Sequence, residues 1–157
     1  MTIGWHIPSQ RGQLVGSRVF DREFFIVCDR EALRHGSYTC VLGPHTRLPM
    51  MYMPDAIRAT LELMQADPTR LQHRNAFNIA AFNVTPAELA QEIQKHLPHF
   101  TIGYQLDPMR QAIADSWPHT LDDSAARQEW GWKPQYDLAG MTKDMLKHLS
   151  VKISPST

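Results

Sequence analysis

The stretch TPAELAQEIQKHLP, residues 85–98, carries the clearest structural signal in the sequence. The Thr85 hydroxyl can accept a hydrogen bond from the backbone of Glu88, and the Glu88 carboxylate can accept one from the backbone of Thr85. This capping box starts a helix. Pro86 suits the first helical position, and Pro98 ends the helix because proline has no N–H to donate. One face of the predicted helix is apolar, as for a helix that packs on a sheet. This face comprises Leu89, Ala90, Ile93 and Leu97.

Strand and helix patterns alternate on both sides of this helix. A second helix is predicted from Met53-Pro54 up to Asp67. Its apolar face comprises Ile57, Leu61 and Met64. The order strand, helix, strand, helix, strand predicts an α/β fold of few short strands with packed helices. The strands are expected at residues 38–42, 48–52, 76–80 and 100–106.

The two ends of the chain differ from this periodic part. Residues 1–30 show no clear periodicity, and we expect a divergent or poorly ordered N-terminal segment there. Residues 31–150 are expected to form one α/β unit, and residues 151–157 a frayed tail. The last helix of the unit is predicted to follow Asp137. Its apolar stripe comprises Leu138, Met141, Met145 and Leu149.

Glycines mark two further helix ends. Gly36 closes a helix that ends within residues 31–35, and Gly131 closes a short helix that Asp122 or Asp123 can cap. Between these helices, the pattern of residues 107–118 leaves both a loop and a short helix open.

Composition excludes several classes of partner. Lysine and arginine together number 16, as do aspartate and glutamate, so the formal net charge is zero. A chain without net charge has no overall field that would attract nucleic acid or an anionic membrane. No apolar run approaches the roughly 20 residues of a membrane-spanning helix, so we expect a soluble chain. The two cysteines, Cys28 and Cys40, form no secreted disulfide framework and are expected to be reduced structural thiols.

The sequence lacks the groups that would make it a complete dehydrogenase. No glycine-rich turn suits a dinucleotide, because Gly12 and Gly16 are four positions apart with no third glycine in register. No tyrosine is followed four residues later by a lysine, the pair that would lower a phenol's pKa for proton abstraction. His96 and His99 have no cysteine or carboxylate at a familiar ligand spacing. We therefore predict no catalytic, cofactor-binding or metal-binding residue in this chain.

Three residues remain as candidates for binding a small molecule. Arg110 could bind a carboxylate or phosphate through two hydrogen bonds, or it could pair with a nearby aspartate. Trp117, which follows Ser116 and precedes Pro118, could form a pocket wall or serve packing alone. The residues themselves leave both choices open.

Several motifs together resemble a known family. They are LPMMYMPDAIRA at 48–59, FNIA at 77–80, TPAE at 85–88, RQAIADSWP at 110–118, DDSAAR at 122–127 and WGW at 130–132. With them, the chain from about residue 31 to 149 resembles the NAD-dependent L-threonine 3-dehydrogenases of the extended short-chain dehydrogenase/reductase family, which are relatives of the nucleotide-sugar epimerases. The run at 110–118 narrows the choice to threonine dehydrogenases. The resemblance covers only the carboxyl-terminal, substrate-side portion of that Rossmann-type fold.

The resemblance implies oxidation of the threonine 3-hydroxyl, with hydride transfer to NAD, in the intact enzyme. The base and the nucleotide site belong to an amino-terminal Rossmann domain that these residues do not contain, so we expect the chain to be inactive alone and to bind no cofactor by itself. Arg110, Ser116 and Trp117 are the residues that the resemblance places nearest the threonine pocket. Relatives suggest the cytoplasm, or the mitochondrial matrix in an animal.

An alternative is a non-catalytic module that pairs with an intact dehydrogenase subunit or with a second copy of itself. The sequence departs from the family before Glu31, where a substrate loop would be expected. Without the Rossmann half, the retained helices are expected to expose apolar faces.

Overall fold

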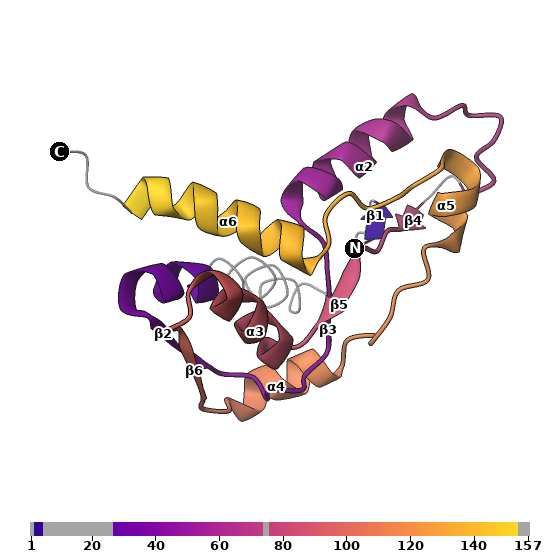
Figure 1. Cartoon of the computed structure of the whole chain (residues 1–157). Helices are drawn as coiled ribbons and strands as arrows, with labels where there is room; N and C mark the ends of the chain where they lie inside the picture. The colour runs from indigo at the N-terminus through magenta and orange to yellow at the C-terminus, as the bar shows by residue number, and fades with distance from the viewer. Residues whose placement is uncertain (1, 5–26, 74–75, 154–157) are drawn as a thin grey trace.

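The computed structural model describes residues 2–4, 27–73 and 76–153. Helices and short strands are mixed along the chain, as the α/β prediction required, and Figure 1 shows their arrangement. Residues 27–35 are helical. The labelled elements follow in the order β1 (Thr2–Gly4), β2 (Ser37–Cys40), β3 (Leu48–Met50), α2 (Met53–Gln65), β4 (Ala76–Asn78), β5 (Phe82–Val84), α3 (Pro86–His96), β6 (Thr101–Tyr104), α4 (Pro108–Asp115), α5 (Ser124–Trp130) and α6 (Leu138–Ile153).

The described strands form three separate pairs. β2 and β6 are parallel, with Ser37 opposite Thr101 and Cys40 opposite Tyr104. β3 pairs with β5, and β1 with β4, both antiparallel. A parallel pair needs a long crossover between its strands, and here the crossover contains α2 and α3.

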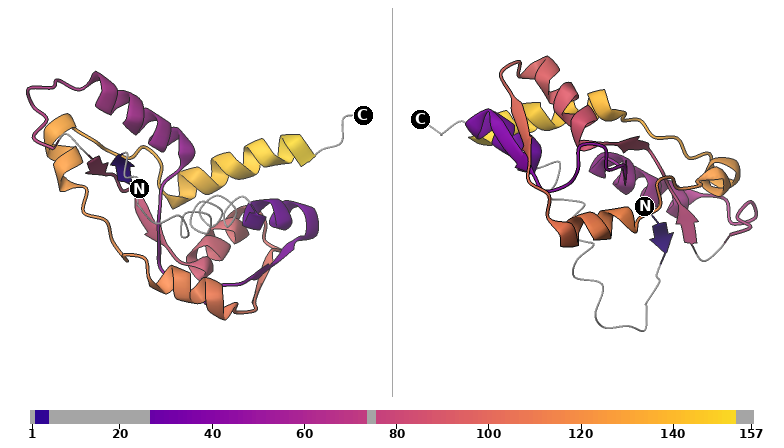
Figure 2. Two further views of the ribbon diagram at one scale, coloured as in Figure 1. Left: turned by 180° about the vertical axis from the view of Figure 1, so that it is seen from behind. Right: turned by 90° about the horizontal axis from the view of Figure 1, so that it is seen from below.

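Two apolar clusters hold these elements together. The larger one joins the helix of residues 27–35 to β2, β3, β5, α3, α4 and α6, and includes the buried side chains of Phe100 and Leu89. The smaller one joins α2, β4 and α5 around Trp132, which is fully buried. In Figure 1 these appear as two groups of elements, with β3 and β5 running between them. A view from below shows the same division (Figure 2).

Most predicted helix ends are confirmed. The Thr85 hydroxyl accepts from the Glu88 backbone at 3.2 Å, and the Thr85 backbone donates to the Glu88 carboxylate at 2.8 Å. Gly36 and Gly131 have φ values of 67° and 78°, a backbone region that costs little only for glycine. The stretch left open at 107–118 contains helix α4, whose first turn is capped by the Asp107 carboxylate.

Other boundaries differ from the predictions. β4 ends at Asn78, two residues before the predicted end, and a separate strand β5 follows that the sequence pattern did not indicate. β6 covers Thr101–Tyr104 rather than residues 100–106. The last helix was expected to end near Ser150, but α6 continues to Ile153. Strands of three or four residues are too short to display a clear alternation, and this explains the errors at their ends.

The apolar face predicted for α2 does not face the described core. Ile57, Leu61 and Met64 are exposed, whereas the buried positions are Asp55, Ala56 and Ala59. The helix carries apolar residues on two sides, and the small side chains are those that fit against the Trp132 cluster. None of the described helices is long and apolar enough to cross a membrane.

Candidate functional site

Helix α4 is fixed to the parallel strand pair through Asp107, the residue that caps its start. The backbone N–H of Asp107 donates to the carbonyl of Val41 at 2.9 Å, and that of Gln105 donates to Cys40 at 2.8 Å. The Asp107 carboxylate then accepts from the backbone of Met109 and Arg110 at 2.9 and 3.2 Å. These bonds satisfy N–H groups that a helix start leaves unpaired. The position of Arg110 is therefore set by the end of β6.

The loop after β2 is fastened to α4 by Gln111. The side-chain oxygen of Gln111 accepts from the Gly43 backbone at 2.9 Å, and its nitrogen donates to the Thr46 hydroxyl at 3.0 Å and to Asp115 at 2.7 Å. Gly43 itself lies in this loop, where a Cβ atom added to it would meet the Thr46 hydroxyl oxygen at 3.3 Å. The sequence pattern does not mark Gln111 as a functional or structural residue. Two of its three partners, Gly43 and Thr46, are more than sixty positions away, so no local pattern indicates its role.

Arg110 is a half-exposed side chain on the same helix. Its guanidinium lies 3.5 Å from the Asp107 carboxylate, one of the ion pairs that the sequence left open. Burial raises the pKa of Tyr38 to about 12, and the two cysteines add to this rise while the positive charge of Arg110 opposes it. Arg110 therefore lies near β2 and supplies positive charge at the edge of the parallel pair.

Trp117 and Ser116 follow at the end of α4. Trp117 is partly buried and packs against the larger apolar cluster. Ser116 is exposed, and its hydroxyl donates to the Ile113 carbonyl at 2.6 Å. Arg110 lies in the first turn of α4, whereas Ser116 is its C-terminal cap and Trp117 follows the helix. The three candidate residues thus lie at the two ends of one short helix, Arg110 paired with Asp107 and Trp117 packed on the larger cluster.

Three tyrosines and both cysteines have raised pKa values, which suit them poorly to proton abstraction or nucleophilic attack. The pKa values of Tyr52 and Tyr104 are raised like that of Tyr38, in each case first by burial. Cys28 and Cys40 are both free and fully buried, and burial is the first cause of the raised pKa of each thiol. A base or nucleophile needs the opposite shift.

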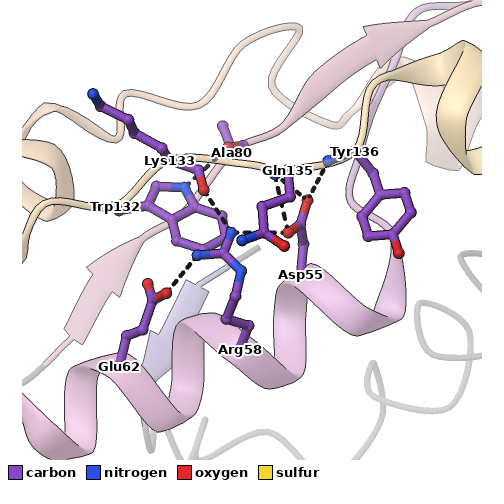
Figure 3. A network of polar contacts seen from close by, with 8 residues as sticks. All are labelled: Asp55, Arg58, Glu62, Ala80, Trp132, Lys133, Gln135 and Tyr136. Carbon is purple, nitrogen blue, oxygen red and sulfur yellow. Dashed lines mark hydrogen bonds and ion pairs between the residues drawn. The ribbon is translucent and has the colours of Figure 1, made fainter.

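Another polar network lies away from α4 and joins α2 to the segment before α6 (Figure 3). Asp55, only 1% exposed, accepts from the backbone of Gln135 at 2.9 Å and of Tyr136 at 3.0 Å. Arg58 donates to Asp55 at 2.9 Å and to the Lys133 carbonyl at 2.5 Å. A buried carboxylate with this many donors needs no ligand to explain it, so we assign the network a structural role.

Trp132 completes this network. The Arg58 guanidinium lies over its ring, 4.7 Å from the centroid, and its indole N–H donates to the Ala80 carbonyl at 3.1 Å. Figure 3 shows the arginine and the ring stacked between α2 and the chain segment of Lys133. Trp132 therefore packs between α2 and the segment of Ala80.

The described residues do not fit a dinucleotide. Three described strands lead directly into helices: β3 into α2 through Met51-Tyr52, β5 into α3 through Thr85, and β6 into α4 through residues 105–107. None of these turns contains a glycine, although a pyrophosphate requires close approach of the backbone. Gly12 and Gly16 lie outside the described residues. Nor do the residues that the structure describes bring together three or more histidine, cysteine or acidic side chains that could hold a metal.

Comparison with known proteins identifies relatives over most of the chain. No protein-family model matches it. The mitochondrial L-threonine 3-dehydrogenase of Bos taurus is 53% identical over 116 residues, which are 74% of this chain and 31% of that protein. The solved L-threonine dehydrogenase of Clostridium difficile is 48% identical, with a TM-score of 0.78, over 80% of this chain and 40% of that one. A monomeric L-threonine 3-dehydrogenase from a metagenome is 40% identical, with a TM-score of 0.76, over 82% and 41%.

Over this shared length the chain is homologous to proteins of the epimerase/dehydratase family, which have a Rossmann-like fold. The particular members that it is similar to are L-threonine 3-dehydrogenases, and the match is to their carboxyl-terminal part. The chain spans about a third to two fifths of the length of these relatives.

Proposed function

We propose that this chain forms the substrate-side part of an NAD-dependent L-threonine 3-dehydrogenase. The reaction would oxidise the threonine 3-hydroxyl to give 2-amino-3-oxobutanoate, with NAD and the proton-accepting base held by an amino-terminal part. The observation that carries this proposal is the 53% identity to the bovine enzyme over a colinear segment. Alone, the chain would bind no NAD and catalyse nothing.

Within this function, α4 would supply the threonine-binding side chains. The half-exposed Arg110 guanidinium suits the threonine carboxylate, because the two groups can share two parallel hydrogen bonds. Trp117, which follows the helix, would form a wall of the pocket. The Ser116 hydroxyl already donates to a carbonyl, so it would serve as an acceptor for the threonine ammonium.

A chimera tests this function. Residues 31–150 would replace the matching segment of the Clostridium difficile enzyme, and NADH formation from threonine would be followed by absorbance. We expect an active chimera in which Arg110→Ala raises KM by about tenfold or more, since a hydrogen bond to a charged group contributes about 1.5–3 kcal/mol. Arg127→Ala is the matched control. Arg127 is also an exposed arginine that pairs with an aspartate, Asp123, but it lies on α5 and not on α4. A folded chimera without activity contradicts the proposal, and equal KM values in the two variants remove Arg110 from the pocket.

A second candidate function is that of a non-catalytic module that pairs with an intact dehydrogenase subunit or with a second copy. The exposed apolar side of α2 favours it. Co-purification of an intact dehydrogenase with this chain, without a gain in threonine oxidation, would support the module over the enzyme part.

The relatives also bear on assembly and compartment. One of the solved relatives is a monomeric enzyme. We therefore propose that one copy of this substrate-side part and one amino-terminal part make a complete catalytic unit. The bovine relative is mitochondrial, and we propose the mitochondrial matrix for this chain if it comes from an animal and the cytoplasm otherwise.

A further inference from the structure

Gln111 joins three groups that belong to two different parts of the chain. Its side-chain oxygen accepts from the backbone N–H of Gly43 at 2.9 Å. Its side-chain nitrogen donates to the Thr46 hydroxyl at 3.0 Å and to Asp115 at 2.7 Å. One amide group therefore fastens the loop of residues 43–46 to helix α4, and each half of the amide has a partner that suits it.

The loop on the far side of this contact is itself held in place. The carbonyl of Pro44 accepts from the backbone N–H of Ala87, in the first turn of α3, at 3.1 Å. The loop also closes on itself, because the Thr46 backbone donates to the Gly43 carbonyl at 3.2 Å. A capping box fixes the start of α3. The loop thus connects the fixed start of α3 to Gln111.

Helix α4 depends on this fastening more than a longer helix would. It has 8 residues, of which only Ala114 is buried, so apolar packing fixes the orientation of the helix only in part. Asp107 holds its first turn, and Gln111 ties its middle to the loop. In Figure 1, α4 lies at the edge of the molecule beside the segment that joins β2 to β3.

We propose that Gln111 is a positioning residue for threonine binding: by locking α4 to the loop of residues 43–46, it holds the Arg110 guanidinium where the threonine carboxylate binds. The inference rests on the proposed function, in which Arg110 binds that carboxylate. Arg110 directly precedes Gln111, so any rotation or tilt of α4 that Gln111 prevents would move the guanidinium. A group that binds substrate must be held within about 0.5 Å of its productive position.

The kinetics of the active chimera test this role. Gln111→Met keeps the length and the helix propensity of the side chain but removes both hydrogen-bonding groups. We expect KM for threonine to rise by about threefold to tenfold, less than in Arg110→Ala because the guanidinium is still present. The value of kcat should change by less than about twofold, since a contact with the carboxylate acts in the ground state and the transition state alike. Gln94→Met is the matched control: Gln94 also binds a backbone carbonyl, that of Phe100, but from α3.

A double-mutant cycle shows whether Gln111 acts through Arg110. In the Arg110→Ala background, Gln111→Met should raise KM no further, because no guanidinium is left to position. An equal rise in both backgrounds overturns the proposal, as do equal KM values in Gln111→Met and Gln94→Met. A lower kcat at unchanged KM also overturns it, because a loss of folded enzyme alone would produce that result.

Amide hydrogen exchange in the whole chain provides a readout that needs no activity. The Gly43 N–H should exchange about tenfold faster in Gln111→Met than in the unsubstituted chain or in Gln94→Met, because its hydrogen-bond acceptor is gone. An unchanged exchange rate contradicts the fastening itself. An active chimera in which Gln111→Met leaves KM unchanged overturns this inference alone. A folded chimera without activity contradicts the proposed function, and the positioning of threonine by Gln111 with it.

Discussion

Asp55 ties together segments that lie eighty positions apart in the sequence. Its buried carboxylate accepts from two backbone N–H groups and from Arg58. We predict that Asp55→Ala lowers the free energy of unfolding by about 3 kcal/mol, because those donors would stay buried without an acceptor. Glu62→Ala removes the other carboxylate that Arg58 contacts, but at a partly exposed site, and should cost less than about 1 kcal/mol. Urea denaturation measures both, and equal losses would contradict this account.

Asp29 should make stability depend on pH. Its side chain is fully buried, neither oxygen has a hydrogen-bond partner among the described residues, and burial raises its pKa from 3.8 to about 7. The folded chain then holds a proton that the unfolded chain releases. The stability from this group is therefore complete below about pH 4 and is lost as the pH rises to about 7.

Asp29→Asn provides the measurement. The unfolding free energy of the wild type relative to the variant should fall across that range, by up to about 4 kcal/mol for a shift of this size. Taking the difference removes the contributions of other titrating groups. Parallel pH curves for the two proteins would show that Asp29 titrates normally.

For single residues, the sequence predicts the role of a side chain where its partners are close to it in the sequence. The partners of Thr85 are three positions away, and the cap was predicted correctly. Asp55 and Gln111 each bind distant backbone N–H groups that only the fold brings close, so neither residue could be recognised from the sequence.

Among the elements, α3 depends most clearly on a local device. We predict that Thr85→Ala lowers the free energy of unfolding by about 1 kcal/mol, because the Glu88 N–H loses its acceptor at the helix start. Thr85→Ser keeps a hydroxyl and should retain most of the stability. Thermal unfolding of the two variants tests the cap, and an alanine variant as stable as the serine variant would show that the hydroxyl contributes little.

Helix α2 shows why a correct helix prediction can carry a wrong orientation. Periodicity located the helix within a few residues, but it ranked the larger apolar side chains as the core face. Packing against Trp132 selected the smaller face instead. A pattern in one sequence does not say which of two apolar faces meets which layer. The same limit explains β5, a three-residue strand that is defined by its partner β3 rather than by its own alternation.

For the whole molecule, the relatives confirm the resemblance noted in the sequence. The chain matches only the carboxyl-terminal part of these relatives. The motifs that carried it are distributed over both apolar clusters and over α4. The α/β class was also predicted correctly, but the separate strand pairs were not, since pairing joins residues far apart in the chain. The roles of Arg110, Ser116 and Trp117 stay predictions.

Calorimetric titration of NAD into the whole purified chain tests the central claim most directly. If the nucleotide site belongs to the amino-terminal part, the chain alone should give no binding heat at concentrations that saturate the active chimera. Binding as tight as that of the chimera would contradict the account, because these residues would then contain a nucleotide site of their own.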